Sequence, residues 1–172
     1  MSTLRHRDSP PGETRRRLTP ALTVLAAALL MCLPLPLAWG VMPNFALLFV
    51  IIWASLQPRL MPAWVAFALG LLLDMLAGLP IGLSALVFAL AVVAVRLAEA
   101  RVEGHSLAVD WAFAALVILA AHLLTWQLHA LVGRTVPLGP LLAQAALTAL
   151  AFPPATALAA RIQRRLVAGG EP

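Results

Sequence analysis

The sequence is poor in charged and reactive side chains. Only 11% of its 172 residues are charged, and its twelve basic residues are all arginines. A single cysteine, Cys32, excludes an internal disulfide and leaves no second thiol for a zinc site. The sequence also lacks a phosphate-binding glycine loop, paired carboxylates and a nucleophile with a neighbouring base. We therefore expect no enzymatic activity, no cofactor and no bound metal.

Apolar residues fill most of the chain. They account for 62% of the residues, and the mean hydropathy is +0.95. A soluble domain of this length cannot bury so much apolar surface, whereas a lipid bilayer accepts it directly. The net charge of +5 would suit nucleic acid, but most arginines flank apolar runs, which is typical of membrane topology. The composition predicts an integral membrane protein that binds the lipid bilayer and no nucleic acid.

Six apolar runs follow one another along the chain, with prolines or a capping residue at their borders. Pro34 and Pro36 end the first run because each lacks an amide donor. Asn44 precedes the second run as an N-cap, and Pro62 and Pro80 open the third and fourth. The sequence therefore predicts an all-α bundle of six transmembrane helices at about 18–39, 44–56, 62–77, 80–98, 107–131 and 138–160.

The segments outside these runs are predicted to be basic cytoplasmic tails, 1–17 and 161–172, the first of them flexible. Arg15, Arg16 and Arg17 precede the first run as they would in a signal peptide, but no small-x-small cleavage site follows. We expect the first run to be a retained span, with Trp39 at the membrane interface. The run 44–56 is short against the roughly 20 residues that cross a bilayer. It is expected to be tilted, shielded by neighbours or half-embedded.

The arginines predict the orientation of the bundle. With six crossings and a cytoplasmic N-terminus, eleven arginines lie in cytoplasmic segments and only Arg134 lies outside. Merging the first two runs into one crossing would place six arginines in the cytoplasm and six outside. Because basic residues concentrate in cytoplasmic loops, six spans with both termini in the cytoplasm are favoured.

Asp74 lies inside an apolar run, where a carboxylate costs about 2.5–3.5 kcal/mol unless it is near an edge or paired. Ala66, Gly70, Asp74 and Gly78 recur every four residues and form one stripe, along which another backbone can approach closely. Gly82, Ala85 and Ala89 form a matching small-residue face on the next run. Two interpretations of Asp74 remain open: a polar site facing the interior or a partner, or a carboxylate bonded to amides of the turn 78–80.

The last two runs carry further polar side chains. His122 and His129, with Thr125 or Trp126 between them, share one helix face and could bind a metal or relay protons. No carboxylate or cysteine completes such a site, so we expect hydrogen bonds between helices instead. Asp110 suits the positive end of a helix dipole. Beyond these lie Gln144 and Thr148, then Thr156 and the pair Pro153-Pro154, which leaves free carbonyls one turn earlier for neighbouring groups to satisfy.

Residues 42–86 contain a series of residues in a characteristic order: Pro43-Asn44, Leu47-Leu48, Trp53, Pro58-Arg59, Phe67, Gly70, Asp74, Gly78, Gly82 and Ala85-Leu86. This series resembles the MreD family of rod shape-determining membrane proteins. The resemblance implies a non-enzymatic component of the bacterial inner membrane that maintains cell shape by scaffolding lateral peptidoglycan synthesis. It also implies a fold like the substrate-binding subunit of energy-coupling-factor transporters. Implied partners are the MreC scaffold, the MreB filament and a peptidoglycan synthase pair, directly or indirectly.

On this basis, the residues expected to form the packing or partner interface are Asn44, Trp53, Pro58, Arg59, Gly70, Asp74, Gly78 and Gly82. The alternative function is a small-molecule-binding subunit of an energy-coupling-factor-type transporter, which follows from the shared architecture alone. Few polar residues could line its pocket, chiefly Asn44, Asp74, His129 and Arg134.

Overall fold

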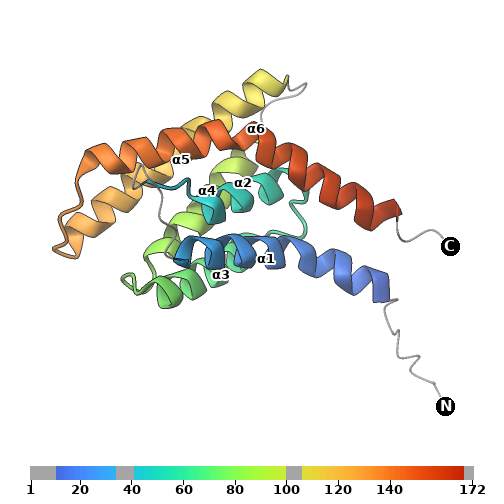
Figure 1. Cartoon of the computed structure of the whole chain (residues 1–172), viewed down its shortest axis with the longest axis horizontal. Coiled ribbons are helices and arrows are strands. Elements are labelled where there is room, and N and C mark those ends of the chain that lie inside the picture. Colours follow the sequence, from blue (N-terminus) through green and yellow to red (C-terminus); the bar gives the residue numbers. More distant parts are fainter. Residues whose placement is uncertain (1–10, 34–40, 100–105, 169–172) are drawn as a thin grey trace, which may run out of the picture.

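The computed structural model describes residues 11–33, 41–99 and 106–168. These residues form helices and no strand, in the order α1 (Pro11–Cys32), α2 (Phe45–Leu56), α3 (Ala63–Ala77), α4 (Leu83–Glu99), α5 (Leu107–Leu131) and α6 (Leu138–Ala168) (Figure 1). The all-helical class predicted from the sequence is thus observed over the described part of the chain.

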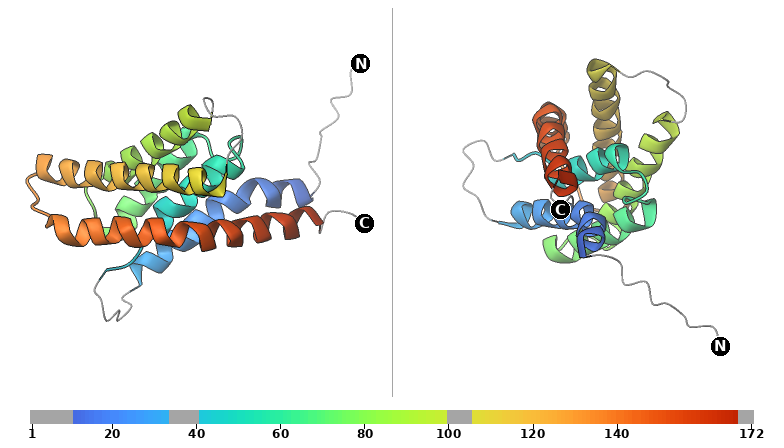
Figure 2. Two further views of the ribbon diagram at one scale, coloured as in Figure 1. Left: turned by 90° about the horizontal axis from the view of Figure 1, so that it is seen from above. Right: turned by 90° about the vertical axis from the view of Figure 1, so that its right-hand side faces the viewer.

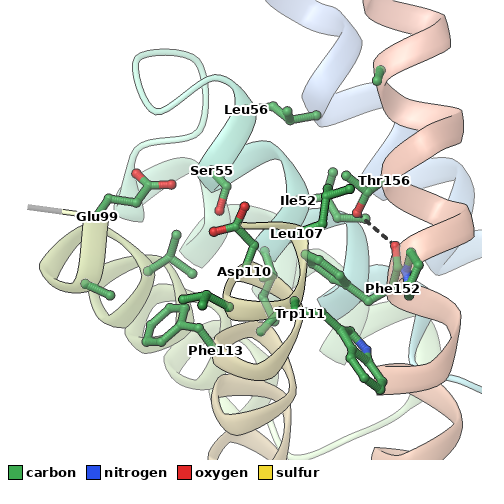
Figure 3. Close-up of a pocket in the computed structure, with 18 of the residues that line it drawn as sticks. Ile52, Ser55, Leu56, Glu99, Leu107, Asp110, Trp111, Phe113, Phe152 and Thr156 are labelled. Carbon is green, nitrogen blue, oxygen red and sulfur yellow. Dashed lines mark hydrogen bonds between the residues drawn. The ribbon is translucent and has the colours of Figure 1, made fainter. Parts of the chain in front are cut away.

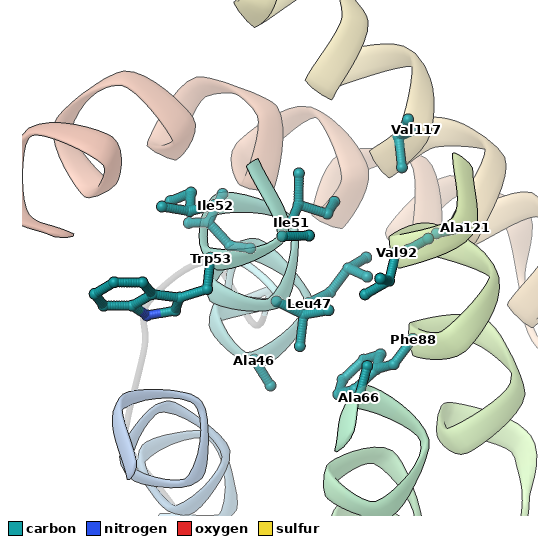
Figure 4. Close-up of a cluster of buried hydrophobic side chains, with 14 of the residues drawn as sticks. Ala46, Leu47, Ile51, Ile52, Trp53, Ala66, Phe88, Val92, Val117 and Ala121 are labelled. Atoms are coloured by element: carbon teal, nitrogen blue, oxygen red, sulfur yellow. The ribbon is translucent and has the colours of Figure 1, made fainter. Parts of the chain in front are cut away.

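The short helix α2 lies at the centre of the bundle. Figure 4 shows it surrounded by the other helices, and eight of its twelve residues are buried. Trp53 and Leu47 point from α2 to different neighbours, and Phe88 of α4 packs in the same core. Among the arrangements expected for this short segment, the structure shows the one in which neighbouring helices shield it.

Three pairs of consecutive helices pack closely against each other. The closest pairs are α3 with α4, α5 with α6, and α1 with α2. Figures 1 and 2 show the start of α1 and the end of α6 at the same end of the bundle, while the α5–α6 connection lies at the opposite end. This arrangement agrees with an even number of passes between the two chain ends.

Several helix borders differ from those expected. α1 begins at Pro11, inside the segment predicted to be a flexible tail, and α6 continues to Ala168, beyond the predicted end at residue 160. α4 begins at Leu83 instead of Pro80, because Gly82 has a φ of 94°, which is incompatible with a right-handed helix. Trp39 lies outside the described residues.

Large apolar side chains cover the outside of the bundle. Trp64 is 73% exposed, Leu116 is 62% exposed and Leu150 is 64% exposed. Within the described residues, two helices are long and apolar enough to cross a membrane, Leu107–Leu131 and Leu138–Arg165, while three apolar segments are shorter. Such an apolar exterior is unusual for a protein surrounded by water.

Candidate functional site

Asp74 joins α3 to the start of α4. Its side chain is fully buried, and its carboxylate accepts hydrogen bonds from the amide of Gly82 at 2.9 Å and the amide of Ser84 at 3.0 and 3.1 Å. Both amides belong to the first turn of α4 or the residue before it, where no intrahelical acceptor exists. The carboxylate therefore caps a neighbouring helix and faces the positive end of its dipole.

The turn between α3 and α4 places Asp74 in this position. Gly78 ends α3 in the left-handed conformation with a φ of 63°, and its amide and that of Leu79 both bond to the main-chain oxygen of Asp74. Of the two interpretations left open for Asp74, the one in which its side chain bonds amides of the turn 78–80 was therefore wrong about the donors. Those amides use the Asp74 carbonyl oxygen, which leaves the carboxylate for Gly82 and Ser84.

Gly70 allows the two helices of this hairpin to meet backbone to backbone. A Cβ atom at Gly70 would lie 2.6 Å from the Ala85 Cα and N atoms and from the Ser84 carbonyl carbon. Real contacts of a Cβ are longer, so only glycine fits. The predicted close approach of small residues is observed between Gly70 and Ala85, one turn from the Asp74 cap.

Asn44 links α2 to α6. Its side-chain oxygen accepts from the Leu47 amide at 3.1 Å, which confirms the predicted N-cap. Its own amide donates to the Thr148 hydroxyl at 2.8 Å, and that hydroxyl donates to the Gln144 carbonyl at 2.6 Å. The Gln144 side chain in turn donates to the Met42 carbonyl at 3.0 Å. The segment before α2 is therefore fixed against α6 by polar contacts on both sides.

Two further polar contacts hold α2 and the loop after it. The Trp53 indole donates to the Thr23 hydroxyl of α1 at 2.7 Å. Arg96 of α4 donates to the carbonyls of Pro58 and Met61, which fixes the α2–α3 loop. Pro58 and Arg59 themselves are exposed in that loop. Of the other predicted interface residues, Gly78 is also exposed, at the connection between α3 and α4.

The hydrogen bonds of the two histidines of α5 stay within that helix. Nδ1 of His122 donates to the Ile118 carbonyl and Nδ1 of His129 donates to the Thr125 carbonyl, each at 2.8 Å and one turn back in α5. The expected hydrogen bonding between helices was wrong for these nitrogens, because the helix carbonyl one turn earlier is within easier reach. No group of three potential metal ligands occurs among the described residues.

Trp111 satisfies a carbonyl that a proline leaves free. Pro153 has no amide for the Ala149 carbonyl four residues earlier, and the Trp111 indole of α5 donates to that oxygen at 2.8 Å. Satisfaction of the freed carbonyls by neighbouring groups, which the sequence predicted, is thus observed at Ala149. This bond connects α5 to the proline-containing part of α6.

We expect a Trp111→Phe variant to unfold at a lower temperature than the parent. Its free energy of unfolding should fall by about 1 kcal/mol, because the Ala149 carbonyl loses its hydrogen-bond donor. Thermal unfolding of the purified protein measures the change. Trp64→Phe is the matched control, because Trp64 is largely exposed. Equal losses in the two variants would show that the Trp111 hydrogen bond does not contribute.

The residues predicted to form an interface lie at several separate helix–helix contacts and do not line one common pocket. Gly70, Asp74, Gly78 and Gly82 come together at the α3–α4 hairpin, whereas Asn44 contacts α6 and Trp53 contacts α1. Sequence reasoning missed Thr23 and Arg96, whose partners are distant in the chain. It also did not identify Trp111, although the Pro153-Pro154 pair indicated that a hydrogen-bond donor was needed for the free carbonyls of α6.

The model of one protein family matches almost the whole chain. This family is the rod shape-determining protein MreD, and the match covers residues 14–166. No curated protein and no solved structure matches the chain significantly. The family match extends well beyond residues 42–86, to which the sequence resemblance was traced.

Proposed function

Because the chain belongs to the MreD family of rod shape-determining proteins, we propose that it is a non-enzymatic membrane component of the bacterial rod complex that scaffolds lateral peptidoglycan synthesis. The observation that carries this proposal is the family match over residues 14–166. A role in determining rod shape follows from the family, and the scaffolding role is our proposal. The transporter alternative is not favoured, since the family match gives it no support.

The α3–α4 hairpin is the proposed framework for partner contacts. Gly70 and Asp74 are buried between the two helices, so their role is to fix the angle and register of the hairpin. Exposed apolar side chains on the same hairpin, such as Met75 and Ile81, are available for a neighbouring protein. We propose that the hairpin supports assembly with MreC, and through it with the MreB filament and the peptidoglycan synthase pair, directly or indirectly.

We further propose six membrane spans in the bacterial inner membrane, with both termini in the cytoplasm. The arginine distribution supports this topology, as do the apolar exterior and the common end of α1 and α6. The apolar part of α1 (Leu18–Cys32) and the helices α2, α3 and α4 are shorter than the roughly 20 residues of a full crossing. Neighbouring helices and local bilayer thinning would accommodate these short segments. The likeness to the substrate-binding subunit of energy-coupling-factor transporters stays a prediction.

Depletion of the protein in a rod-shaped host tests the proposed function. Cells are expected to become round, and incorporation of labelled peptidoglycan precursor along the lateral wall is expected to fall. Cross-linking from membranes would then identify the proteins attached to α3 and α4. Rods of normal shape with intact lateral synthesis would contradict the proposal.

The topology predicts which surface cysteines react from outside the cell. In a Cys32→Ser background, a membrane-impermeant maleimide is expected to label Arg134→Cys in intact spheroplasts. Arg59→Cys and Arg161→Cys should react only after permeabilisation. All three positions are exposed at the protein surface, so accessibility depends on membrane side. Labelling of Arg59→Cys from the outside would exclude the six-span arrangement.

A further inference from the structure

A cavity of about 920 Å³ lies between α2, α4, α5 and α6. Its wall is almost entirely apolar, with Ile52, Phe113, Ala114 and Phe152 among the residues that line it. Figure 3 shows these helices around the cavity, with the first turns of α5 opposite the part of α6 that follows Phe152. The volume is within the range of about 300–1,000 Å³ that is typical of small-molecule sites. The wall therefore suits a flexible hydrocarbon chain.

The polar groups of the cavity come mainly from helix ends. Ser55 belongs to the last turn of α2, Glu99 ends α4, and Asp110 lies in the first turn of α5. In Figure 3, Ser55 and Asp110 are drawn in the middle of the view, and Glu99 is drawn at its left. Within the described part of the chain, the Glu99 carboxylate makes no ion pair. One end of an otherwise apolar cavity thus carries two carboxyl groups.

The two carboxyl groups of the cavity differ from Asp74 of the α3–α4 hairpin in their surroundings. The Asp74 side chain is fully buried, whereas Glu99 and Asp110 are half-buried at the edge of a cavity. Each carboxylate has several acceptor positions for a cationic donor. An occupant with an apolar chain and a primary ammonium group would match both parts of the site.

We propose that this cavity binds one phospholipid with an ammonium headgroup, such as phosphatidylethanolamine, from the inner leaflet of the membrane. One acyl chain fills the apolar part, and the ammonium group pairs with Glu99 and Asp110. The helix ends that supply these carboxyl groups connect to cytoplasmic loops in the proposed topology, so the headgroup lies at the cytoplasmic membrane surface. The inference rests on that membrane placement and adds a lipid site to the proposed scaffold.

Native mass spectrometry tests the proposal on the full chain in nanodiscs of equal phosphatidylethanolamine and phosphatidylglycerol. We expect one phosphatidylethanolamine to be retained per chain. Ala157→Phe places a ring in the cavity and should release it, while Ala146→Phe, at an exposed position of α6 outside the cavity, should not. The double variant Glu99→Gln/Asp110→Asn should keep a bound lipid and lose the preference for phosphatidylethanolamine.

A diazirine placed on the acyl chain of phosphatidylethanolamine separates the remaining outcomes. Labelled peptides are expected from the start of α5 and from α6 around Thr156, and this labelling should fall several-fold in Ala157→Phe. Equal retention of both lipids by the parent, or retention unaffected by Ala157→Phe, would overturn the lipid site. If even the exposed faces of α4 and α6 remain unlabelled, the membrane placement itself fails, which distinguishes the two proposals.

Discussion

A Gly70→Ala variant is expected to lose much of its stability and to fail to restore rod shape in a depleted host. The added Cβ would lie 2.6 Å from backbone atoms of Ala85, so no side-chain rotation can relieve the overlap. The helices α3 and α4 would have to separate. Overpacking of a core typically costs about 1–3 kcal/mol, and a backbone neighbour places this site at the upper end. Thermal unfolding of the purified protein and cell shape in the complemented strain are the measurements.

Gly139→Ala provides the matched control for this variant. Gly139 also lies in a helix, and a Cβ at that position would meet no atom within 4 Å. Alanine favours a helix over glycine by up to about 1 kcal/mol, so this substitution is expected to be neutral or stabilising. The same gain applies in principle to Gly70, where the overlap with α4 outweighs it. Equal stability of the two variants would contradict close backbone packing in the hairpin.

An Asp74→Ala variant is expected to be still less stable, because it leaves the buried Ser84 amide and the partly buried Gly82 amide without an acceptor. The Gly82 and Ser84 amides lie at the start of α4, and among the described contacts they donate hydrogen bonds only to this carboxylate. A buried donor without a partner costs about 1–3 kcal/mol, and two donors are affected here. We expect loss of folded protein from membranes and round cells, measured by the detergent-extracted yield and by microscopy.

Asp74→Asn separates hydrogen bonding from charge. The amide oxygen can still accept from the helix start, so only the interaction of the negative charge with the helix dipole is lost, about 0.3–1 kcal/mol or somewhat more in a buried site. Ser84→Ala is the control, because it removes the side chain and keeps the bonded amide. If Asp74→Asn were as damaging as Asp74→Ala, the charge itself would be required. If Asp74→Ala were as stable as the parent, the capping role would be excluded.

The sequence predicted those features of the fold that depend on neighbouring residues. Asn44 lies directly before an apolar run, so its capping of the Leu47 amide follows from local geometry. The four-residue spacing of Gly70 and Asp74 predicted that both lie on one face of α3, and the structure buries both against α4. The pattern of residues 42–86 also led to the family that the longer match confirmed.

Contacts between distant parts of the chain could not be obtained in this way. Which amides the Asp74 carboxylate accepts depends on the path of the turn at Gly78 and Gly82, two glycines with positive φ values that rotate α4 toward α3. The pairing of Trp111 with the Ala149 carbonyl depends on how α5 packs beside a proline in α6. Neither the turn path nor the packing distance is encoded by periodicity, which reports only the face of a helix.

The sequence by itself determined the helical class, the apolar exterior and the stripe that carries Asp74, because composition and spacing act through solvent and local backbone geometry. Tertiary structure decided what Asp74 does, because an acceptor is defined by the donors that folding brings to it. The buried carboxylate is a cap for α4, and the glycine one turn before it brings the two helices into contact.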